Sequence, residues 1–298
     1  MQVIRITPRG YCYGVVDAMT MVRRAAQDPA MPRPIHVLGL IVHNRHAVAE
    51  LDKWGVVHLD GPERLGLLEQ VPSGTVIFTA HGVSPAVKER ARARGLNVLD
   101  ATCPDVTRTH DLIGQLVAAG SAIIYIGKKG HPEPEGAMGE APAGRVQLVE
   151  TEDDLADLKI PKGSPVAIVT QTTLSRWDTA ALIDRLKTMF PEAEVHNEIC
   201  LATQLRQEAA VTQADQCDLV VVVGDERSNN SNRLVQVVQE VAHRPAYLVG
   251  TVDDIDPRWL VGKKTVGVTA GSSTPSQLTR QVIEFLEAYR PDPVAVSH

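Results

Sequence analysis

The chain has 298 residues, of which 44% are hydrophobic, 22% are charged and 4% are aromatic, and its formal net charge is -6. These fractions are typical of an ordinary folded protein, and the length allows one large domain or two to three smaller ones. A negative charge and few aromatic side chains argue against a nucleic-acid surface, which needs a basic stripe and stacking platforms. No apolar run approaches the roughly 18 residues that span a bilayer, and no signal-peptide core opens the sequence. We therefore expect a cytoplasmic protein that binds a small molecule and contacts neither nucleic acid nor membrane.

The cysteines reveal how the chain is organised. Four cysteines are too few for a disulfide framework in a cytoplasmic protein, and none of them forms a CxxC pair. Cys12, Cys103 and Cys200 lie 91 and 97 residues apart. Such even spacing predicts an internal repeat.

The predicted elements follow one order in each repeat. Each of the three cysteines ends a short strand-like segment and opens a helix-like one. An apolar strand that ends in glycine comes 24 to 27 residues later, and a third strand with a hydroxyl-rich loop comes another 40 to 45 residues on. The glycines are Gly39, Gly127 and Gly224, and the matching threonines of the third strand are Thr79, Thr170 and Thr269.

These strands predict an α/β fold. The runs LVVVV, AIIYI and TVIF are continuous rather than alternating, as expected for strands covered on both faces. We predict three similar small α/β domains with mainly parallel sheets, in a pseudo-threefold arrangement around a central site at the carboxyl ends of the strands. The predicted domains are residues 13–102, residues 103–199, and residues 200–285 with residues 1–12, whose strand would close the third sheet. Residues 286–298 are predicted to form a C-terminal tail.

The three evenly spaced cysteines predict a metal centre. One cysteine alone is most often a small buried hydrophobe, but three thiolates that converge at equivalent strand ends need a metal. A closed zinc site needs a fourth ligand, which CxxC-type knuckles usually supply and this chain lacks. An iron–sulfur cluster with three thiolates keeps one open iron that can act as Lewis acid and electron donor. Cys217 has no equivalent in the other repeats and is predicted to be structural.

The loops after the second and third strands are rich in hydrogen-bond donors. Such loops at helix N-termini bind phosphate groups, although any single Ser, Thr or Asn could be a helix cap. The segment GHPEPEG adds carboxyl groups, and an acid there could protonate a departing hydroxyl. Glu133 is closer to the strand end than Glu135 and is the stronger candidate. The polar candidates are His43, Asn44, His81, His131, Thr172, Ser228, Asn229, Asn230, Ser272 and Ser273.

Nine motifs in order resemble one known family over about residues 1–285. The motifs are PRGYCYGV, VHN, AHGVS, DATCP, GHPEPEG, TQTTLS, EICLATQLRQEA, SNNSNRL and GVTAGSS. Together they resemble the 4-hydroxy-3-methylbut-2-enyl diphosphate reductases, which catalyse the last step of the non-mevalonate isoprenoid pathway.

The resemblance implies a [4Fe-4S] cluster held by Cys12, Cys103 and Cys200, with one open iron that binds the allylic hydroxyl of the substrate. Two electrons enter from a donor such as ferredoxin or flavodoxin, and water departs with protons delivered from Glu133. The products are isopentenyl and dimethylallyl diphosphates. Thr172 would be a polar neighbour of the hydroxyl, and His131 would serve both catalysis and substrate binding. The implied substrate-binding residues are His43, His81, His131, Thr172, Ser228, Asn229, Asn230 and Ser273. Many relatives have SSNSN where this chain has SNNSN, so Asn229 replaces a serine.

Two other classes of function are compatible with the residues. A non-redox hydratase would use the open iron only as a Lewis acid on a small phosphorylated substrate. An iron–sulfur sensor or a zinc-stabilised binding module would have no catalytic activity. Metal and sulfide analysis separates these alternatives, together with a test for electron consumption.

Overall fold

Residues 1–290, which the computed structural model describes, form three four-stranded sheets flanked by helices. Every strand pairing in these sheets is parallel. The predicted α/β class with three parallel sheets is therefore confirmed. Within these residues no helix is both long enough and apolar enough to cross a bilayer.

The three sheets share one strand order. The first has the order β3-β2-β4-β5 and contains β2 (Ile35–Leu38), β3 (Val56–His58), β4 (Thr75–Phe78) and β5 (Asn97–Asp100). The second has the order β7-β6-β8-β9 and contains β6 (Ala122–Ile126), β7 (Val146–Val149), β8 (Val166–Thr170) and β9 (Glu194–His196). The third has the order β11-β10-β12-β1 and contains β10 (Leu219–Val223), β11 (Ala246–Val249), β12 (Thr265–Ala270) and β1 (Gln2–Arg5).

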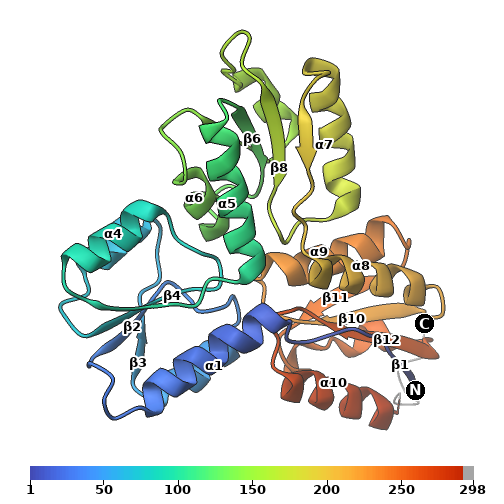
Figure 1. Ribbon diagram of the computed structural model, residues 1–298. Helices are drawn as coiled ribbons and strands as arrows, with labels where there is room; N and C mark the ends of the chain where they lie inside the picture. The colour runs from blue at the N-terminus through green and yellow to red at the C-terminus, as the bar shows by residue number, and fades with distance from the viewer. Residues whose placement is uncertain (291–298) are drawn as a thin grey trace. The chain divides into compact units, whose positions relative to one another are not determined.

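This common order confirms the internal repeat. In each sheet the strand that precedes Gly39, Gly127 or Gly224 (β2, β6 or β10) pairs with the strand that leads to the matching threonine (β4, β8 or β12). The outer neighbour of the threonine-bearing strand is the strand that precedes a cysteine. In the third sheet this place belongs to β1, which comes from the opposite end of the sequence. Figure 1 shows β1, drawn in blue, beside the orange-red β12.

Helices begin directly after each of the three evenly spaced cysteines. These helices are α1 (Tyr13–Gln27), α5 (Pro104–Ala118) and α8 (Leu201–Ala214). The other α-helices are α2 (Arg45–Asp52), α3 (Arg64–Glu69), α4 (Pro85–Ala93), α6 (Pro132–Met138), α7 (Arg176–Met189), α9 (Asn229–Glu240) and α10 (Ser276–Ala288). Three short 3-10 helices complete the set: η1 (Glu152–Asp157), η2 (Val252–Asp254) and η3 (Pro257–Leu260).

Strand β10 shows why the continuous apolar runs are buried on both faces. Its residues are all fully buried, and successive side chains point to opposite faces of the sheet. Leu219, Val221 and Val223 pack in one core cluster with the apolar residues of α10. Val220 and Val222 pack in another cluster with residues of α8 and α9. Strand β6 divides in the same way between α7 on one face and α5 with α6 on the other.

The chain divides into two compact units. The first unit comprises Met1–Cys12, His43–Ala47 and the described chain from Leu201 on, and it holds the third sheet. The second unit comprises Tyr13–Val42 and Val48–Cys200, and it holds the first and second sheets. The segment His43–Ala47 packs with the first unit, although the sequence prediction gives it to the domain of residues 13–102. The bond from the backbone N–H of Arg45 to Asp225 (2.9 Å) explains this placement.

Helix α10 passes residue 285, where the third domain is predicted to end, and continues to Ala288. It does so because Leu286 is fully buried in the core of the third sheet. Of the predicted C-terminal tail, residues 291–298 lie outside the described residues.

Candidate active site

The backbone holds the three evenly spaced cysteines in the same way. Each cysteine N–H donates to a carbonyl oxygen of the hydroxyl-rich loop that follows the threonine-bearing strand of its own sheet. The bonds run from Cys12 to Ser272 (3.2 Å), from Cys103 to Ala80 (3.1 Å) and from Cys200 to Thr172 (3.0 Å). The repeat thus fixes each thiol at the carboxyl end of its sheet, where ligands bind in parallel α/β structures.

Cys12 lies on a loop that Arg206 ties to helix α8. Gly10 has a positive φ of 71°, which lets the chain turn after β1. The buried guanidinium of Arg206 donates to the carbonyl oxygens of Gly10 (2.7 Å) and Tyr11 (3.2 Å). The sequence prediction did not find this role, because the motif that contains Arg206 gives no sign that its side chain reaches a loop near the start of the chain.

Cys103 packs against the first turn of α1. A Cβ atom on Gly14 would lie 2.5 Å from Cys103 Sγ, so only glycine permits this approach. The neighbouring Tyr13 hydroxyl donates a hydrogen bond to the carboxylate of Asp105. Burial raises the pKa of Tyr13, and the hydrogen bond to Asp105 and the negative charges of Cys103 and Cys200 raise it further. Tyr13 is therefore close to both Cys103 and Cys200, two of the predicted ligands.

The four cysteines separate into two kinds. Cys12, Cys103 and Cys200 are partly exposed, whereas Cys217 is buried. Cys217 lies just before β10 in an apolar cluster, and burial raises the pKa of its thiol to about 11. Three accessible thiols at equivalent strand ends are a donor set that suits a metal–sulfur cluster, and Cys217 has the structural setting expected for it.

Glu133 is a buried acid at the start of helix α6. Its side chain is 1% exposed, and its carboxylate accepts a hydrogen bond from the backbone N–H of Thr172 (2.7 Å). Burial raises the pKa of Glu133, and the hydrogen bonds from Thr172 only partly oppose this effect. Glu135 instead accepts a bond from the backbone N–H of Arg64 (2.7 Å), which gives it a structural partner.

His131 caps helix α6, and its hydrogen bonds define its tautomer. Its Nδ1 accepts from the backbone N–H of Glu133 (3.2 Å) and lies 3.2 Å from Nε2 of Gln171. Gln171 is oriented by its Oε1, which accepts from the N–H of Lys128 (2.9 Å). With Nδ1 as an acceptor, the ring proton of neutral His131 lies on Nε2, which is therefore a donor. Gln171 was not among the predicted site residues, although the TQTTLS motif contains it.

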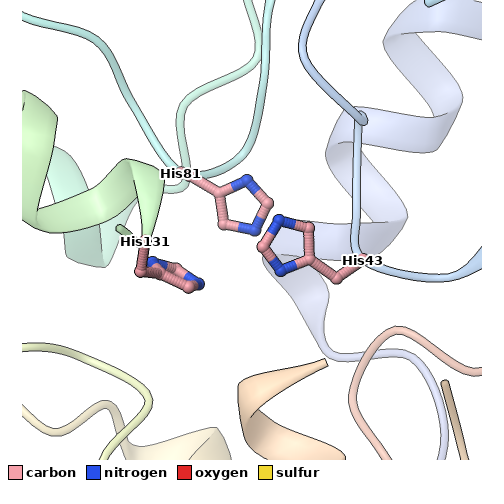
Figure 2. Close-up of side chains that lie close together, drawn as sticks. All are labelled: His43, His81 and His131. Carbon is pink, nitrogen blue, oxygen red and sulfur yellow. The ribbon is translucent and has the colours of Figure 1, made fainter. Parts of the chain in front are cut away.

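A second histidine of this unit lies next to His131. The rings of His81 and His131 are edge to face, with centroids 5.2 Å apart. Figure 2 shows both side chains. Thr79 Oγ lies 3.3 Å from His81 Nδ1 and connects the ring to the end of β4. Figure 2 also labels His43, which belongs to the first unit. The second unit thus brings together His81, His131, Glu133 and Thr172 of the predicted set.

The first unit gathers the serine and asparagine candidates. Ser273 Oγ donates to the carbonyl oxygen of His43 (3.1 Å) and lies 3.4 Å from Ser228 Oγ. Asn230 Oδ1 accepts from the backbone N–H of Ser272 (2.8 Å), and its Nδ2 is buried without a hydrogen-bond partner among residues 1–290. A buried donor without a partner can bind a ligand or a water molecule. Asn229 is buried beside Asn230 at the start of α9.

Two polar candidates also have ordinary capping roles. Asn44 Oδ1 accepts from the backbone N–H groups of His46 (3.1 Å) and Ala47 (3.2 Å) at the start of α2. Ser228 Oγ accepts from the N–H of Ser231 (3.2 Å) and caps α9. Such caps fix the loops, because they satisfy N–H groups that a helix start leaves unpaired.

Comparison with known proteins agrees with this arrangement. The model of the LytB protein family matches residues 3–287. A 4-hydroxy-3-methylbut-2-enyl diphosphate reductase of Symbiobacterium thermophilum is 64% identical over 97% of this chain and 98% of the relative. The enzyme of the same name from Bacillus cytotoxicus is 57% identical over 98% of this chain and 92% of the relative.

Solved structures agree as well. The E-1-hydroxy-2-methyl-but-2-enyl-4-diphosphate reductase from Plasmodium falciparum superposes with a TM-score of 0.89 at 34% identity, over 98% of this chain and 89% of that one. A structure described as (E)-4-hydroxy-3-methyl-but-2-enyl diphosphate reductase, the terminal enzyme of the non-mevalonate pathway, gives a TM-score of 0.68 at 32% identity, over 97% of this chain and 100% of that one. The chain therefore belongs to the LytB family of iron–sulfur reductases.

Proposed function

We propose that this chain reduces (E)-4-hydroxy-3-methylbut-2-enyl diphosphate to isopentenyl and dimethylallyl diphosphates. The reaction takes two electrons and two protons. The allylic C–O bond breaks, the hydroxyl leaves as water with one proton, and the second proton forms a C–H bond. The observation that carries the proposal is the buried acid Glu133, with its pKa raised by burial, in a chain whose close relatives bear the name of this reductase.

Cys12, Cys103 and Cys200 would hold a [4Fe-4S] cluster with one open iron. When bound, the cluster supplies electrons and a Lewis acid to the substrate. The equivalent backbone bonds of the three cysteines support this assignment. We also propose the predicted domains (residues 13–102, residues 103–199, and residues 200–285 with residues 1–12), in pseudo-threefold arrangement around the cluster.

Glu133 would donate the proton that turns the hydroxyl into water. A raised pKa keeps a larger fraction of the carboxyl protonated near neutral pH, which is the form that an acid catalyst needs. The backbone bond from Thr172 fixes the direction of the carboxyl group. The Thr172 side chain would contact the hydroxyl of the substrate, and His131 would help to hold the proton donor in place.

The diphosphate would be bound by groups that donate hydrogen bonds. In the second unit His131 presents Nε2–H, and His81 lies beside it. In the first unit Asn230 presents the unpaired Nδ2–H₂ group. Donor groups of this kind bind the oxygens of an anion without a glycine-rich P-loop. The proposed set is His43, His81, His131, Thr172, Ser228, Asn229, Asn230 and Ser273.

Anaerobic purification followed by iron and sulfide analysis, and then turnover with a reduced dye, tests the proposal. We expect about four iron and four sulfide per chain, as a cubane cluster requires. Dye oxidation should depend on the substrate, with two electrons consumed for each product molecule formed. Zinc without sulfide would contradict the cluster, and turnover without dye oxidation would indicate a hydratase instead.

The electron donor and the compartment are proposals of the same kind. A small redox protein such as ferredoxin or flavodoxin would supply the two electrons that the reaction consumes. We also propose a cytoplasmic location, as the sequence predicts. Replacing the dye by each purified redox protein identifies the donors that support turnover.

A further inference from the structure

His110, a buried residue of helix α5, pairs with the partly buried Glu140. Its side chain is 6% exposed, and its Nδ1 lies 2.8 Å from Glu140 Oε1. An ionised carboxylate only accepts hydrogen bonds, so the proton of this contact lies on Nδ1. The opposite ring nitrogen, Nε2, is buried without a hydrogen-bond partner among residues 1–290. An unpaired buried nitrogen costs free energy, so the position of this imidazole requires an explanation.

The unpaired edge of the imidazole faces two glycines. A Cβ atom on Gly82 would lie 3.1 Å from His110 Cε1 and 3.3 Å from Nε2. A Cβ atom on Gly136 would lie 3.0 Å from Cε1 and 3.2 Å from Nε2. Both backbones therefore approach the ring so closely that a Cβ atom at either position would force the ring or the backbone to shift by a few tenths of an ångström.

Each glycine belongs to a loop or helix that carries predicted site residues. Gly82 directly follows His81 and has a positive φ of 78°, which the turn after β4 requires. Gly136 lies in α6, the helix that begins with His131 and Glu133. The imidazole thus lies between the turn of His81 and the helix of Glu133, and Glu140 fixes its rotation.

We infer that His110, anchored by Glu140, is a positioning residue that sets the spacing between the His81 turn and helix α6, and hence the geometry of Glu133. This inference deepens the proposed function and rests on it for the role of Glu133. A longer or shorter side chain at position 110 would move α6 relative to the His81 turn. A small misplacement of a catalytic group lowers turnover much more than it weakens binding of the whole substrate.

Electrostatics gives independent support. A positive charge on His110 lowers the pKa of Glu133, so the two side chains are close enough to interact. A surface cavity lies over the pair, and its charged lining residues are Lys88, Glu89, Arg92, Asp111 and Glu140.

His110→Phe tests the inference, with His58→Phe as a matched control. The phenyl ring removes the hydrogen bond to Glu140 and is somewhat larger than imidazole, and the control substitution makes the same change in size. His58 forms a similar pair in the same unit: its Nδ1 lies 3.0 Å from Asp52 Oδ1, its side chain is 5% exposed and its Nε2 has no partner among the described residues. His58 lies on β3, outside both site loops.

We expect kcat of His110→Phe to fall by about ten- to a hundredfold, with a smaller change in KM. His58→Phe should retain wild-type kcat. Glu140→Ala should resemble His110→Phe, and Glu140→Gln should be close to wild type because the amide oxygen still accepts from Nδ1. Equal kcat values for His110→Phe and His58→Phe would overturn the inference.

Hydrogen exchange supplies a readout that does not depend on turnover. Peptides that contain His81 and helix α6 should exchange faster in His110→Phe than in wild type or His58→Phe. Unchanged exchange in both peptides would refute the positioning role even if turnover fell. If the wild-type protein does not reduce the substrate, the proposed function is wrong. Faster exchange in His110→Phe than in the wild type would still support the positioning role in that case.

Discussion

Replacing Glu133 by glutamine separates the chemical role of this acid from its effect on stability. Glutamine has almost the same shape, and its amide oxygen can still accept the hydrogen bond from the backbone N–H of Thr172, which is 2.7 Å long in the wild type. The amide cannot donate a proton to a leaving hydroxyl. A positioned general acid contributes about 10²- to 10⁴-fold to a rate. We therefore expect kcat to fall by this factor, equivalent to about 3–5 kcal/mol.

The same substitution should stabilise the folded protein at neutral and alkaline pH. Burial raises the pKa of Glu133 in the folded state above that in the unfolded chain, which is about 4.3. The folded state thus binds this proton more tightly, and wild-type stability decreases as the pH rises from about 4.3 toward the folded-state pKa. Glutamine does not titrate. The free energy of unfolding of Glu133→Gln, relative to that of the wild type, should therefore increase between about pH 4.3 and the folded-state pKa and stay constant above it. The final difference should be about 1.4 kcal/mol for each tenfold difference in proton affinity between the folded and unfolded states.

Both effects are measured on cluster-loaded protein prepared without oxygen. Turnover is followed by the substrate-dependent oxidation of a reduced dye, and substrate binding is measured separately by calorimetry. Thermal unfolding at several pH values gives the stability difference, and a matched iron content of the two proteins is the control. The reasoning would be wrong if Glu133→Gln turned over within about threefold of wild type, because a general acid contributes far more than that. A stability difference that decreased with rising pH would contradict the raised pKa.

Three further substitutions test other parts of the site. Asn230→Asp keeps the acceptor for the Ser272 N–H but adds a negative charge where Nδ2 is unpaired. The KM from steady-state kinetics should therefore rise by about tenfold or more, and binding of inorganic pyrophosphate should weaken as well. An unchanged KM would show that Asn230 does not bind the diphosphate. Gly14→Ala places a Cβ atom 2.5 Å from Cys103 Sγ, and the iron content per chain should fall, whereas full cluster loading would show that α1 can move away. Cys217→Ala should leave the iron content unchanged. Because Cys217 is buried in an apolar cluster, the free energy of unfolding in urea should fall by about 1–2 kcal/mol. Loss of iron would show that Cys217 also holds metal.

Much of the fold was predictable because the repeat is visible in the residues. The spacing of Cys12, Cys103 and Cys200 indicated three similar units, and the continuous apolar runs indicated strands buried on both faces. Parallel sheets with one common strand order follow from these two features. The sequence also predicted that the strand of residues 1–12 closes the third sheet, and in the structure this strand, β1, pairs with β12.

Other features depend on contacts between residues far apart in the sequence. The bonds from Arg206 to the carbonyls of Gly10 and Tyr11 join segments almost 200 residues apart. The packing of His43–Ala47 with the first unit likewise depends on Asp225. No local pattern of spacing or hydrophobicity carries such information, so the predicted domain of residues 13–102 included this segment.

The sequence by itself determined the kind of chemistry, and the tertiary structure decided its details. The sequence shows three thiols without a fourth ligand, an acid and donor-rich loops. These features can be recognised directly because they depend only on residue type and spacing. The raised pKa of Glu133, the tautomer of His131 and the position of His110 between two glycines arise only when folding removes water and fixes partners. Burial and hydrogen bonding thus convert a list of candidate side chains into groups with defined protonation and direction.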